Sequence, residues 1–239
     1  SSSTCGQCEL IDPCALASSK KLIVFSCHLE CGTKRLISQG AGFDVYDKSD
    51  LHLLLSQYKD QYVIVKNRYE SASIGMTDKN VFRLCQNSLQ HLNNLLKEMC
   101  TDSLLVQEYI DGIECEVLVL QYKGKYYALD PVQILFKTNL NFIDTDTSNT
   151  YNYEFKVIES SIKFLLQATA QKAAELLGVK DYARFDFRIK KGVPYLFDIA
   201  GTPYTIYHSS IAYLFTQYYQ MPYENIYKVI VACMLSNYE

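Results

Sequence analysis

The chain lacks a marked excess of either charge. It carries 23 Lys and Arg residues against 26 Asp and Glu residues, for a formal net charge of -3, and no basic stripe runs along it. Proteins that bind nucleic acid through its phosphates usually need such a stripe or a strongly basic balance. We therefore expect no nucleic-acid partner.

The chain also lacks long apolar runs. No run approaches the roughly 20 residues that a membrane-spanning helix needs, and the start, SSSTCGQCEL, has neither the charged nor the apolar region of a signal peptide. We therefore expect a cytoplasmic protein without a membrane segment. An initial methionine is missing as well, which fits either a processed chain or a fragment of a longer protein.

What the chain has is an ordinary globular composition, with 49% hydrophobic and 21% charged residues. Its 239 residues can bury a sizeable core and fall between one large domain and two small ones.

Cysteine is frequent, with nine residues, an odd number that argues against a disulfide framework and for a reducing compartment. Cys5 and Cys8 form a C-x-x-C pair, so a structural zinc site is one alternative, although the spacing matches no pattern of four ligands. Four others lie in apolar stretches and are expected as buried thiols: Cys85, Cys100, Cys115 and Cys233.

Hydrophobic periodicity predicts a mixture of helices and strands in the first half of the chain. Residues 21–26 and 62–66 are expected as strands, and residues 33–39 and 51–58 as helices. Apolar residues recur at helical spacing over 81–99 after a Thr77-Asp78 cap, which predicts one helix there.

In the second half, three segments are expected to form an antiparallel meander: 104–110, 114–122 and 126–135, with turns at Asp111-Gly112 and Lys123-Gly124. A polar loop over 139–152 follows. Helices are expected over 160–177, closed by Gly178, and over 225–235.

The strongest candidate site lies in the C-terminal third. Polar and apolar residues alternate over 182–189, so Arg184, Asp186 and Arg188 share one strand face. A tight turn leads into a second strand, and pairing across it sets Asp186 within a residue or two of opposite Asp198. Facing carboxylates repel unless a cation lies between them, as Mg²⁺ does when it bridges carboxylates and nucleotide phosphates. The alternative is an arginine ion pair on a solvated face.

A second candidate is the end of the strand at 62–66. Lys66 is followed by residues 71–75 (SASIG), small residues that let backbone N–H groups and hydroxyls such as that of Ser73 approach phosphate. The lysine precedes the loop, so the segment is not a Walker loop. A strand end with a Ser-rich turn is the alternative.

A third candidate is a hinge, in which Gln107, Glu108, Tyr109 and Ile110 lead into an Asp-Gly turn and Glu114 opens the next strand. Such a hinge can offer backbone groups to an adenine edge and a carboxylate to ribose hydroxyls. An exposed hairpin with solvated carboxylates fits the same residues.

A fourth candidate follows the polar loop, where Tyr151, Tyr153 and Lys156 occur together. A lid that brings a cation over a phosphate has this composition. A loop anchored by aromatic residues is the alternative.

The chain thus carries, in this order, a strand-end lysine, a hinge, a Tyr-rich loop and an Arg-x-Asp hairpin. In this order the features resemble the ATP-grasp superfamily, and more narrowly the D-alanine:D-alanine ligases. The resemblance runs from TKRLISQGAGFDVY at 33–46 to HSS at 208–210. It implies an α+β fold in which two subdomains with mainly antiparallel sheets sandwich a nucleotide. Residues 1–30 would be an N-terminal remnant or linker, 31–110 the small subdomain and 111–239 the large C-terminal subdomain.

The resemblance also implies an ATP- and Mg²⁺-dependent ligase that joins a carboxylate to an amine through an acyl phosphate. Its partners would be small amino-acid-like substrates, and it would be a homodimer or be completed by another domain. By role, the implied residues are Lys66, Ser73 and Lys156 for phosphates; Gln107, Glu108, Tyr109 and Ile110 for adenine; Glu114 for ribose; Asp186 and Asp198 for Mg²⁺; Arg184 and Ser209 for catalysis; and Tyr153, His208 and Ser209 for the substrate.

The chain departs from the family pattern at several positions. Ala200 takes the place of the asparagine in the family's Glu-x-Asn metal strand, and Tyr204 takes a glycine position at the oxyanion. Gln107 replaces the hinge glutamate, Ala72 replaces a loop serine, and Glu30 lies near the place of a missing phosphate-binding lysine. Most of the family's N-terminal substrate domain is also absent.

Two other hypotheses account for these departures. One is a catalytically degenerate ATP-grasp module that binds nucleotide or regulates, since fold alone does not separate active from silent members. The other is a protein-interaction module built on the tyrosines near the C-terminus, which fall in helical stretches and are more readily explained as packing residues: Tyr213, Tyr218, Tyr219, Tyr223 and Tyr227.

Overall fold

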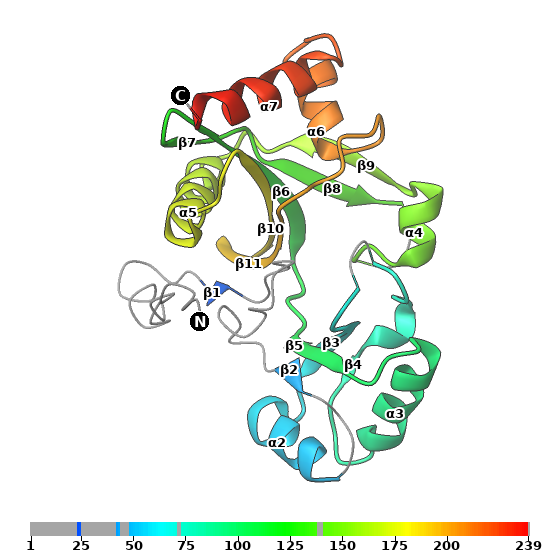
Figure 1. Ribbon diagram of the computed structural model, residues 1–239. Coiled ribbons are helices and arrows are strands. Elements are labelled where there is room, and N and C mark those ends of the chain that lie inside the picture. Colours follow the sequence, from blue (N-terminus) through cyan, green and yellow to red (C-terminus); the bar gives the residue numbers. More distant parts are fainter. Residues whose placement is uncertain (1–22, 25–41, 44–47, 71–72, 138–140, 239) are drawn as a thin grey trace, which may run out of the picture.

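The structure is a computed structural model that describes residues 23–24, 42–43, 48–70, 73–137 and 141–238. Its strands form two sheets in two lobes (Figure 1). The large sheet has the order β1-β11-β10-β6-β8-β9, with β7 paired to β6, and the small sheet has the order β2-β5-β3-β4.

The strands of the large sheet are β1 (Ile23–Val24), β6 (Ile113–Tyr122), β7 (Lys125–Ala128), β8 (Val132–Phe136), β9 (Tyr153–Val157), β10 (Tyr182–Lys190) and β11 (Val193–Ala200). Those of the small sheet are β2 (Gly42–Phe43), β3 (Tyr62–Asn67), β4 (Val81–Arg83) and β5 (Leu104–Glu108). Described strand pairs are antiparallel except β1 with β11.

The small lobe packs two helices, α2 (Lys48–Tyr58) and α3 (Ser88–Glu98), on one face of its sheet. Val63 and Val106 are fully buried in one core cluster with Leu54 of α2 and Leu92 of α3. The predictions of a helix over 51–58 and a strand over 62–66 are confirmed. Because side chains alternate along a strand, the other face of this sheet is left to the large lobe.

The prediction of one helix over 81–99 is wrong. A single 3-10 turn, η1 (Asp78–Asn80), leads into β4, which pairs with β3, and α3 begins only at Ser88. The break is fixed by Asn80, whose buried side chain donates to the Val65 carbonyl at 2.7 Å. That bond anchors the chain beside β3, so the apolar residues at helical spacing belong to a strand and a helix that share one core.

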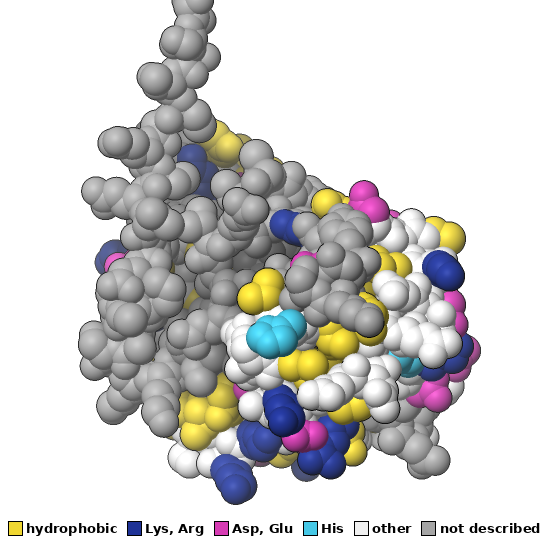
Figure 2. All heavy atoms as spheres, turned by 90° about the horizontal axis from the view of Figure 1, so that it is seen from below, with side chains coloured by type: hydrophobic (Ala, Val, Ile, Leu, Met, Phe, Trp, Pro, Cys, Tyr) yellow, Lys and Arg dark blue, Asp and Glu magenta, His cyan; other side chains and the backbone are white. Residues whose placement is uncertain are grey.

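The surface of the small lobe carries mixed charge. Figure 2 shows the molecule from this end, where Lys and Arg side chains lie beside Asp and Glu side chains. The exposed ion pairs in the described part of the lobe include Lys79 Nζ to Glu98 Oε1 at 3.1 Å and Arg83 Nη2 to Asp60 Oδ1 at 3.6 Å. Exposed pairs contribute little to stability, so this lobe depends on its apolar core.

The large lobe has three layers (Figure 1). On one face of the sheet lies α5 (Ile162–Leu177), which places Leu166 in one core cluster with Phe185 and Phe187. On the other face lie α6 (Ser210–Tyr213), the π-helical segment η2 (Leu214–Tyr218) and α7 (Asn225–Ser236), in one cluster with Leu118 and Leu120 of β6. The predicted helices over 160–177, with Gly178 as its left-handed C-cap, and 225–235 are confirmed.

The face of β6 under α6 and α7 is apolar at one end and acidic at the other. Leu118 and Leu120 lie beneath the helices, and Glu114 and Glu116 follow on the same face because side chains alternate along a strand. Both glutamates are buried, at 7% and 6% exposure, and line a cavity. The acidic end of the face therefore turns toward the small lobe.

The predicted hairpin is confirmed in β10 and β11. Lys191 and Gly192 form its turn with φ of 51° and 74°, a left-handed conformation that suits a two-residue hairpin turn. Asp186 is the direct Cα partner of Asp198, and a β-bulge follows Asp186. The two carboxylates are thus cross-strand neighbours.

The predicted meander is only partly correct. The single strand expected over 126–135 is two strands, β7 and β8, and both pair with β6. β5 belongs to the small sheet, and residues 109–112 cross between the lobes. Gly112 explains the difference, because a Cβ on it would lie 2.4 Å from the Ile189 carbonyl oxygen. The link is packed against the end of β10 and does not turn back on β5.

Two smaller predictions also need correction. The polar loop over 139–152 contains a short helix, α4 (Thr145–Thr150), capped by Asp144, whose side chain accepts from the Thr147 N–H at 2.8 Å. Cys85 and Cys100 are exposed, whereas Cys115 and Cys233 are buried as expected. The first two thiols lie at the ends of packed elements, where an apolar neighbourhood in sequence does not guarantee burial.

Other predictions fall partly or wholly on residues that the structure does not describe. The strand expected over 21–26 is described only as β1, and the helix over 33–39 and the Cys5-Cys8 pair lie outside the described residues. Among the described helices, none has the length and apolar character needed to cross a membrane.

The close approach at Gly112 makes a testable prediction. Gly112→Ala should lower the free energy of unfolding by about 1–3 kcal/mol, because the added methyl group forces the link away from β10. Urea denaturation measures this loss. Gly201→Ala is the matched control: a Cβ there meets nothing within 4 Å, so its effect should stay within about 0.5 kcal/mol. Equal effects of the two changes would contradict the close approach.

Candidate functional site

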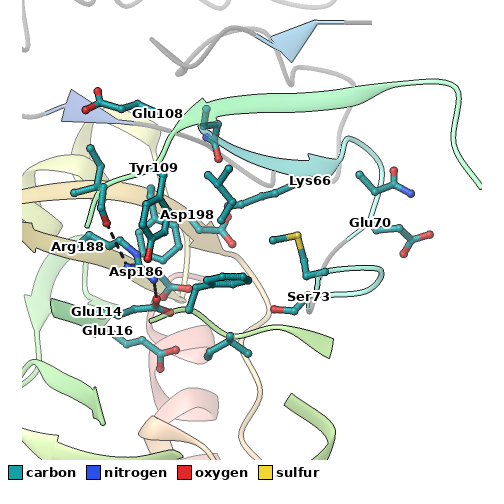
Figure 3. A pocket seen from close by; sticks show the side chains of 18 of the residues that line it. Lys66, Glu70, Ser73, Glu108, Tyr109, Glu114, Glu116, Asp186, Arg188 and Asp198 are labelled. Carbon is teal, nitrogen blue, oxygen red and sulfur yellow. Dashed lines mark hydrogen bonds and ion pairs between the residues drawn. The ribbon is translucent and has the colours of Figure 1, made fainter. Parts of the chain in front are cut away.

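A cavity of about 160 Å³ lies between the two sheets (Figure 3). One wall comes from β3, from the segment that follows β3 and from β5 of the small sheet. The other wall comes from β6, β10 and β11 of the large sheet. It gathers ten of the residues proposed from the sequence: Lys66, Ser73, Gln107, Glu108, Tyr109, Ile110, Glu114, Arg184, Asp186 and Asp198.

Lys66 enters the cavity from β3. Val63 and Val65 point into the core of the small lobe, so Ile64 and Lys66 project from the opposite face. The Lys66 Nζ lies 5.2 Å from the centre of the Phe197 ring on β11. Burial lowers the pKa of Lys66, against the opposing charge of Asp198. A partly buried ammonium close to carboxylates of the other sheet is therefore poised for an anionic ligand.

The hairpin carboxylates face this lysine from the large sheet. Burial raises the pKa of Asp186, although Arg184 opposes the shift and Asp198 adds to it. Arg184 binds Asp186 with two hydrogen bonds, Nε to Oδ1 at 2.7 Å and Nη2 to Oδ2 at 2.8 Å. The sequence left open an arginine ion pair on a solvated face; the pair exists, but Asp186 is only 6% exposed.

Glu116 is a third carboxylate beside this pair that the sequence analysis missed. It is the Cα partner of Asp186 on the other side of β10 from Asp198. Ser210 donates to its Oε2, and the Arg184 Nε lies 3.5 Å from its Oε1. Burial raises the pKa of Glu116 to about 7, with Arg184 opposing the shift. Side chains alternate along a strand, so Glu116 shares a face with Glu114, and this spacing could have identified Glu116 from the sequence.

A buried ion pair between Arg188 and Glu114 closes one side of the cavity. Arg188 is 4% exposed, donates to the Glu114 carboxylate, and donates from Nη1 to the Ile110 carbonyl at 3.3 Å. Its Nη2 also donates to the Asn141 carbonyl at 2.5 Å. Burial raises the pKa of Glu114, against the charge of Arg188. Arg188 thus joins β6, the hinge and a distant loop.

Four predicted residues do not line the cavity. Lys156 is exposed on β9 opposite Gln133, so its role over a phosphate stays a prediction. Tyr153 and His208 belong to an aromatic cluster, with ring centres 5.0 Å apart. Ser209 is the N-cap of α6, since its Oγ accepts from the Ala212 N–H at 3.1 Å.

The aromatic cluster lies close to the acidic end of the cavity. Burial raises the pKa of Tyr153 to about 12, and the charge of Glu116 adds to the shift. The His208 ring also contacts that of Tyr151 in a tilted arrangement, with ring centres 4.4 Å apart, and burial lowers the pKa of His208. Because Ser210 follows Ser209 and binds Glu116, α6 connects the cluster to the carboxylates.

The donor set of the cavity suits a hard cation. Asp186 and Asp198 face each other across the hairpin, and two carboxylates with water and phosphate oxygens are a common Mg²⁺ environment. No group of three or more His, Cys, Asp or Glu side chains within the described part of the chain is arranged to hold a metal alone. Ala200, two residues after Asp198, adds no donor atom.

Comparison with known proteins identifies the family. The family described as D-ala D-ala ligase C-terminus matches residues 49–231. The chain belongs to this family. The matched region includes the cavity-lining residues from Ile64 to Asp198 and all strands of the two sheets except β1 and β2.

Two curated relatives match similar shares of this chain. A D-alanine–D-alanine ligase from Maridesulfovibrio salexigens is 30% identical over 145 residues, covering 59% of this chain and 45% of that protein. One from Pseudothermotoga lettingae is 27% identical over 153 residues, with 59% and 46% covered. The chain thus spans less than half the length of these relatives.

Solved structures show the same fold. The VanG D-Ala:D-Ser ligase of Enterococcus faecalis superposes with a TM-score of 0.60 at 13% identity, covering 80% of this chain and 55% of that one. The D-alanine–D-alanine ligase of Coxiella burnetii gives 0.54 at 17% identity, with 81% and 51% covered. The predicted α+β, ATP-grasp fold is confirmed.

The buried ion pair makes a prediction about stability. Arg188→Met should lower the free energy of unfolding by about 3–5 kcal/mol, because it leaves the Glu114 carboxylate buried without its partner. Adding Glu114→Gln should recover a large part of that loss. Urea denaturation of the parent, of each single variant and of the double variant measures the coupling energy between Arg188 and Glu114. Lys172→Met, which removes an exposed pair with Glu175, is the control and should cost under about 1 kcal/mol.

Proposed function

We propose that the chain binds ATP with Mg²⁺ between its two sheets and takes part in joining a carboxylate to an amine. The observation that carries the proposal is the opposition of Lys66 on the small sheet to Asp186 and Asp198 on the large sheet, across one cavity. A cationic wall facing a pair of carboxylates suits a nucleotide whose phosphates are shared between a lysine and a metal ion.

The parts of the nucleotide fit different ends of the cavity. Lys66 and the segment at Ser73 would hold phosphates, and the hinge at Tyr109 and Ile110 would border the base. Family resemblance assigns Glu114 to the ribose. The structure adds that Arg188 already holds this carboxylate, so Glu114 would contact the ribose with its orientation fixed.

The proposed reaction has two steps. A substrate carboxylate oxygen attacks the γ-phosphorus of ATP, the bond from that phosphorus to ADP breaks, and an acyl phosphate forms. An amine then attacks the acyl carbon, phosphate leaves with the electrons of the broken C–O bond, and the amine loses a proton. Mg²⁺ held by Asp186 and Asp198 would neutralise phosphate charge. Arg184, beside these carboxylates, would stabilise the oxyanion.

The amino-acid substrate would lie toward the aromatic cluster. Tyr153 and His208 lie near Glu116, at the end of the cavity away from the hinge. Because the chain spans less than half the length of its curated relatives, we propose that another domain or chain completes this part of the site.

A catalytically degenerate nucleotide-binding module is the second candidate function. It is favoured by Ala200, which offers no metal ligand, and by the double hydrogen bond that engages Arg184 with Asp186. Both functions share the nucleotide site and differ in whether phosphate is transferred.

Nucleotide binding is tested first by thermal unfolding. ATP with Mg²⁺ should raise the midpoint, because a ligand that binds only the folded state stabilises it, by about 2.7 kcal/mol at a hundred times its dissociation constant. Lys66→Met should reduce the shift at least several-fold, and Lys172→Met, on the outer surface of α5, should leave it unchanged. No shift in the parent would contradict the nucleotide site.

If ATP does stabilise the parent, a second assay separates the ligase from the degenerate module. Phosphate release from ATP that depends on D-alanine is expected of the ligase and not of the degenerate module.

The metal site is tested by restoring a ligand. Ala200→Asn should lower the Mg²⁺ concentration needed for half-maximal thermal stabilisation by ATP about tenfold, because it adds a carbonyl oxygen two residues from Asp198. Ala200→Ser is the control for added volume with a poorer ligand. An unchanged Mg²⁺ requirement would show that the loss of asparagine does not weaken the metal site.

A further inference from the structure

The guanidinium of Arg184 lies beside carboxylates from two strands. Asp186, which is on β10 like Arg184 itself, accepts two hydrogen bonds, from Nε at 2.7 Å and from Nη2 at 2.8 Å. The same Nε lies 3.5 Å from Oε1 of Glu116 on β6. One nitrogen of Arg184 is therefore close to two carboxylates and is bonded to the nearer one.

Glu116 is itself held in place. It is 6% exposed and lines the cavity, as Glu114 does (Figure 3). Its Oε2 accepts a hydrogen bond from the hydroxyl of Ser210, the first residue of α6, which is also buried. The other oxygen, Oε1, is the one near Arg184. Helix α6 thus fixes the carboxylate that stands beside the guanidinium.

The order of the strands separates Glu116 from the proposed metal position. Asp186 is the Cα partner of Asp198 on β11 and of Glu116 on β6, so these two carboxylates flank it on opposite sides. A metal ion shared by Asp186 and Asp198 would lie on the β11 side. Glu116 approaches Arg184 from the β6 side.

Asp186 cannot hold a metal ion and keep both of its bonds to Arg184 at full strength. A bidentate pair with a guanidinium uses both oxygens of the carboxylate, and Mg²⁺ needs its oxygen ligands at about 2.0–2.1 Å in near-octahedral geometry. The positive charges of the ion and the guanidinium also repel each other. Arg184 is largely buried, so loosening its contact with Asp186 is costly unless another carboxylate takes its place.

We propose that Glu116 is a positioning residue, which takes over the guanidinium of Arg184 when Asp186 binds a metal ion. The inference rests on the proposed function, which assigns Asp186 and Asp198 to Mg²⁺. With Nε turned to Glu116, the charge of Arg184 stays balanced and its Nη groups stay in the cavity for the oxyanion. The double hydrogen bond between Arg184 and Asp186 is then compatible with catalysis, because β6 supplies the replacement partner.

The test measures the Mg²⁺ concentration needed for half-maximal thermal stabilisation of the 239-residue chain by ATP. Glu116→Gln should raise this concentration about tenfold, as expected for the loss of one charge-assisted hydrogen bond, because Arg184 then competes with the ion for Asp186. Ser210→Ala keeps every charge but releases Glu116, so it should raise the concentration by a smaller factor, about threefold.

Arg184→Met supplies the control background. Alone it should lower the Mg²⁺ concentration, because the competitor for Asp186 is gone. Combined with it, Glu116→Gln should change the concentration less than about twofold, because Glu116 acts through Arg184. A readout of metal requirement in a double-variant cycle would not follow this pattern if Glu116 merely supported the fold.

The outcomes separate this inference from the function on which it rests. An unchanged Mg²⁺ requirement in Glu116→Gln and Ser210→Ala would overturn the role of Glu116 and leave the nucleotide site intact. An equal rise with and without Arg184 would overturn it too, since the loss of a negative charge near the ion would then explain the effect. If Glu116→Gln does not fold, the same comparison in Ser210→Ala decides. Failure of ATP to stabilise the parent at any Mg²⁺ concentration would instead remove the proposed function.

Discussion

The geometry of the cavity depends on the buried guanidinium of Arg188. It projects from β10, yet its bonds reach Glu114 on β6, the Ile110 carbonyl in the link between the lobes, and the Asn141 carbonyl beyond β8. Removing one partner of such a network leaves a buried charge uncompensated. The contacts of Arg188 therefore stabilise one another. The tight packing of Gly112 on β10 holds the same link from its other side. The link between the two sheets is therefore held against β10.

The balance of charge in the cavity supports the proposal that a metal ion accompanies the nucleotide. The lining holds three basic side chains, Lys66, Arg184 and Arg188, and six carboxylates: Glu70, Glu108, Glu114, Glu116, Asp186 and Asp198. Arg188 is committed to Glu114, and Arg184 is shared between Asp186 and Glu116. A polyphosphate adds further negative charge, so its binding requires a metal ion, protonation of a carboxylate, or both. Burial raises the pKa of Glu116 to about 7, so this residue can take a proton near neutral pH.

Much of this arrangement could be predicted from the sequence because it is local. Alternation along β10 and the tight turn at Lys191-Gly192 were enough to place Asp186 opposite Asp198. Contacts between distant segments were not predictable in the same way: nothing near β10 in sequence indicates that Arg188 meets Ile110. For the same reason β5 was expected to pair with β6, although the steric demand that separates them comes from Ile189. Glu116 was missed because its neighbours in the site come from β10 and α6.

The two halves of the proposed reaction differ in how much of the chain they need. Every cavity-lining residue from Ile64 to Asp198 lies within the matched span 49–231, so the proposed nucleotide site needs only this part of the chain. The aromatic cluster of Tyr153 and His208 lies outside the lining, beside Glu116 and α6. A nucleotide site confined to one chain can persist while the amino-acid site changes or is supplied by another domain. The proposed nucleotide binding and the proposed ligase activity can therefore be tested separately.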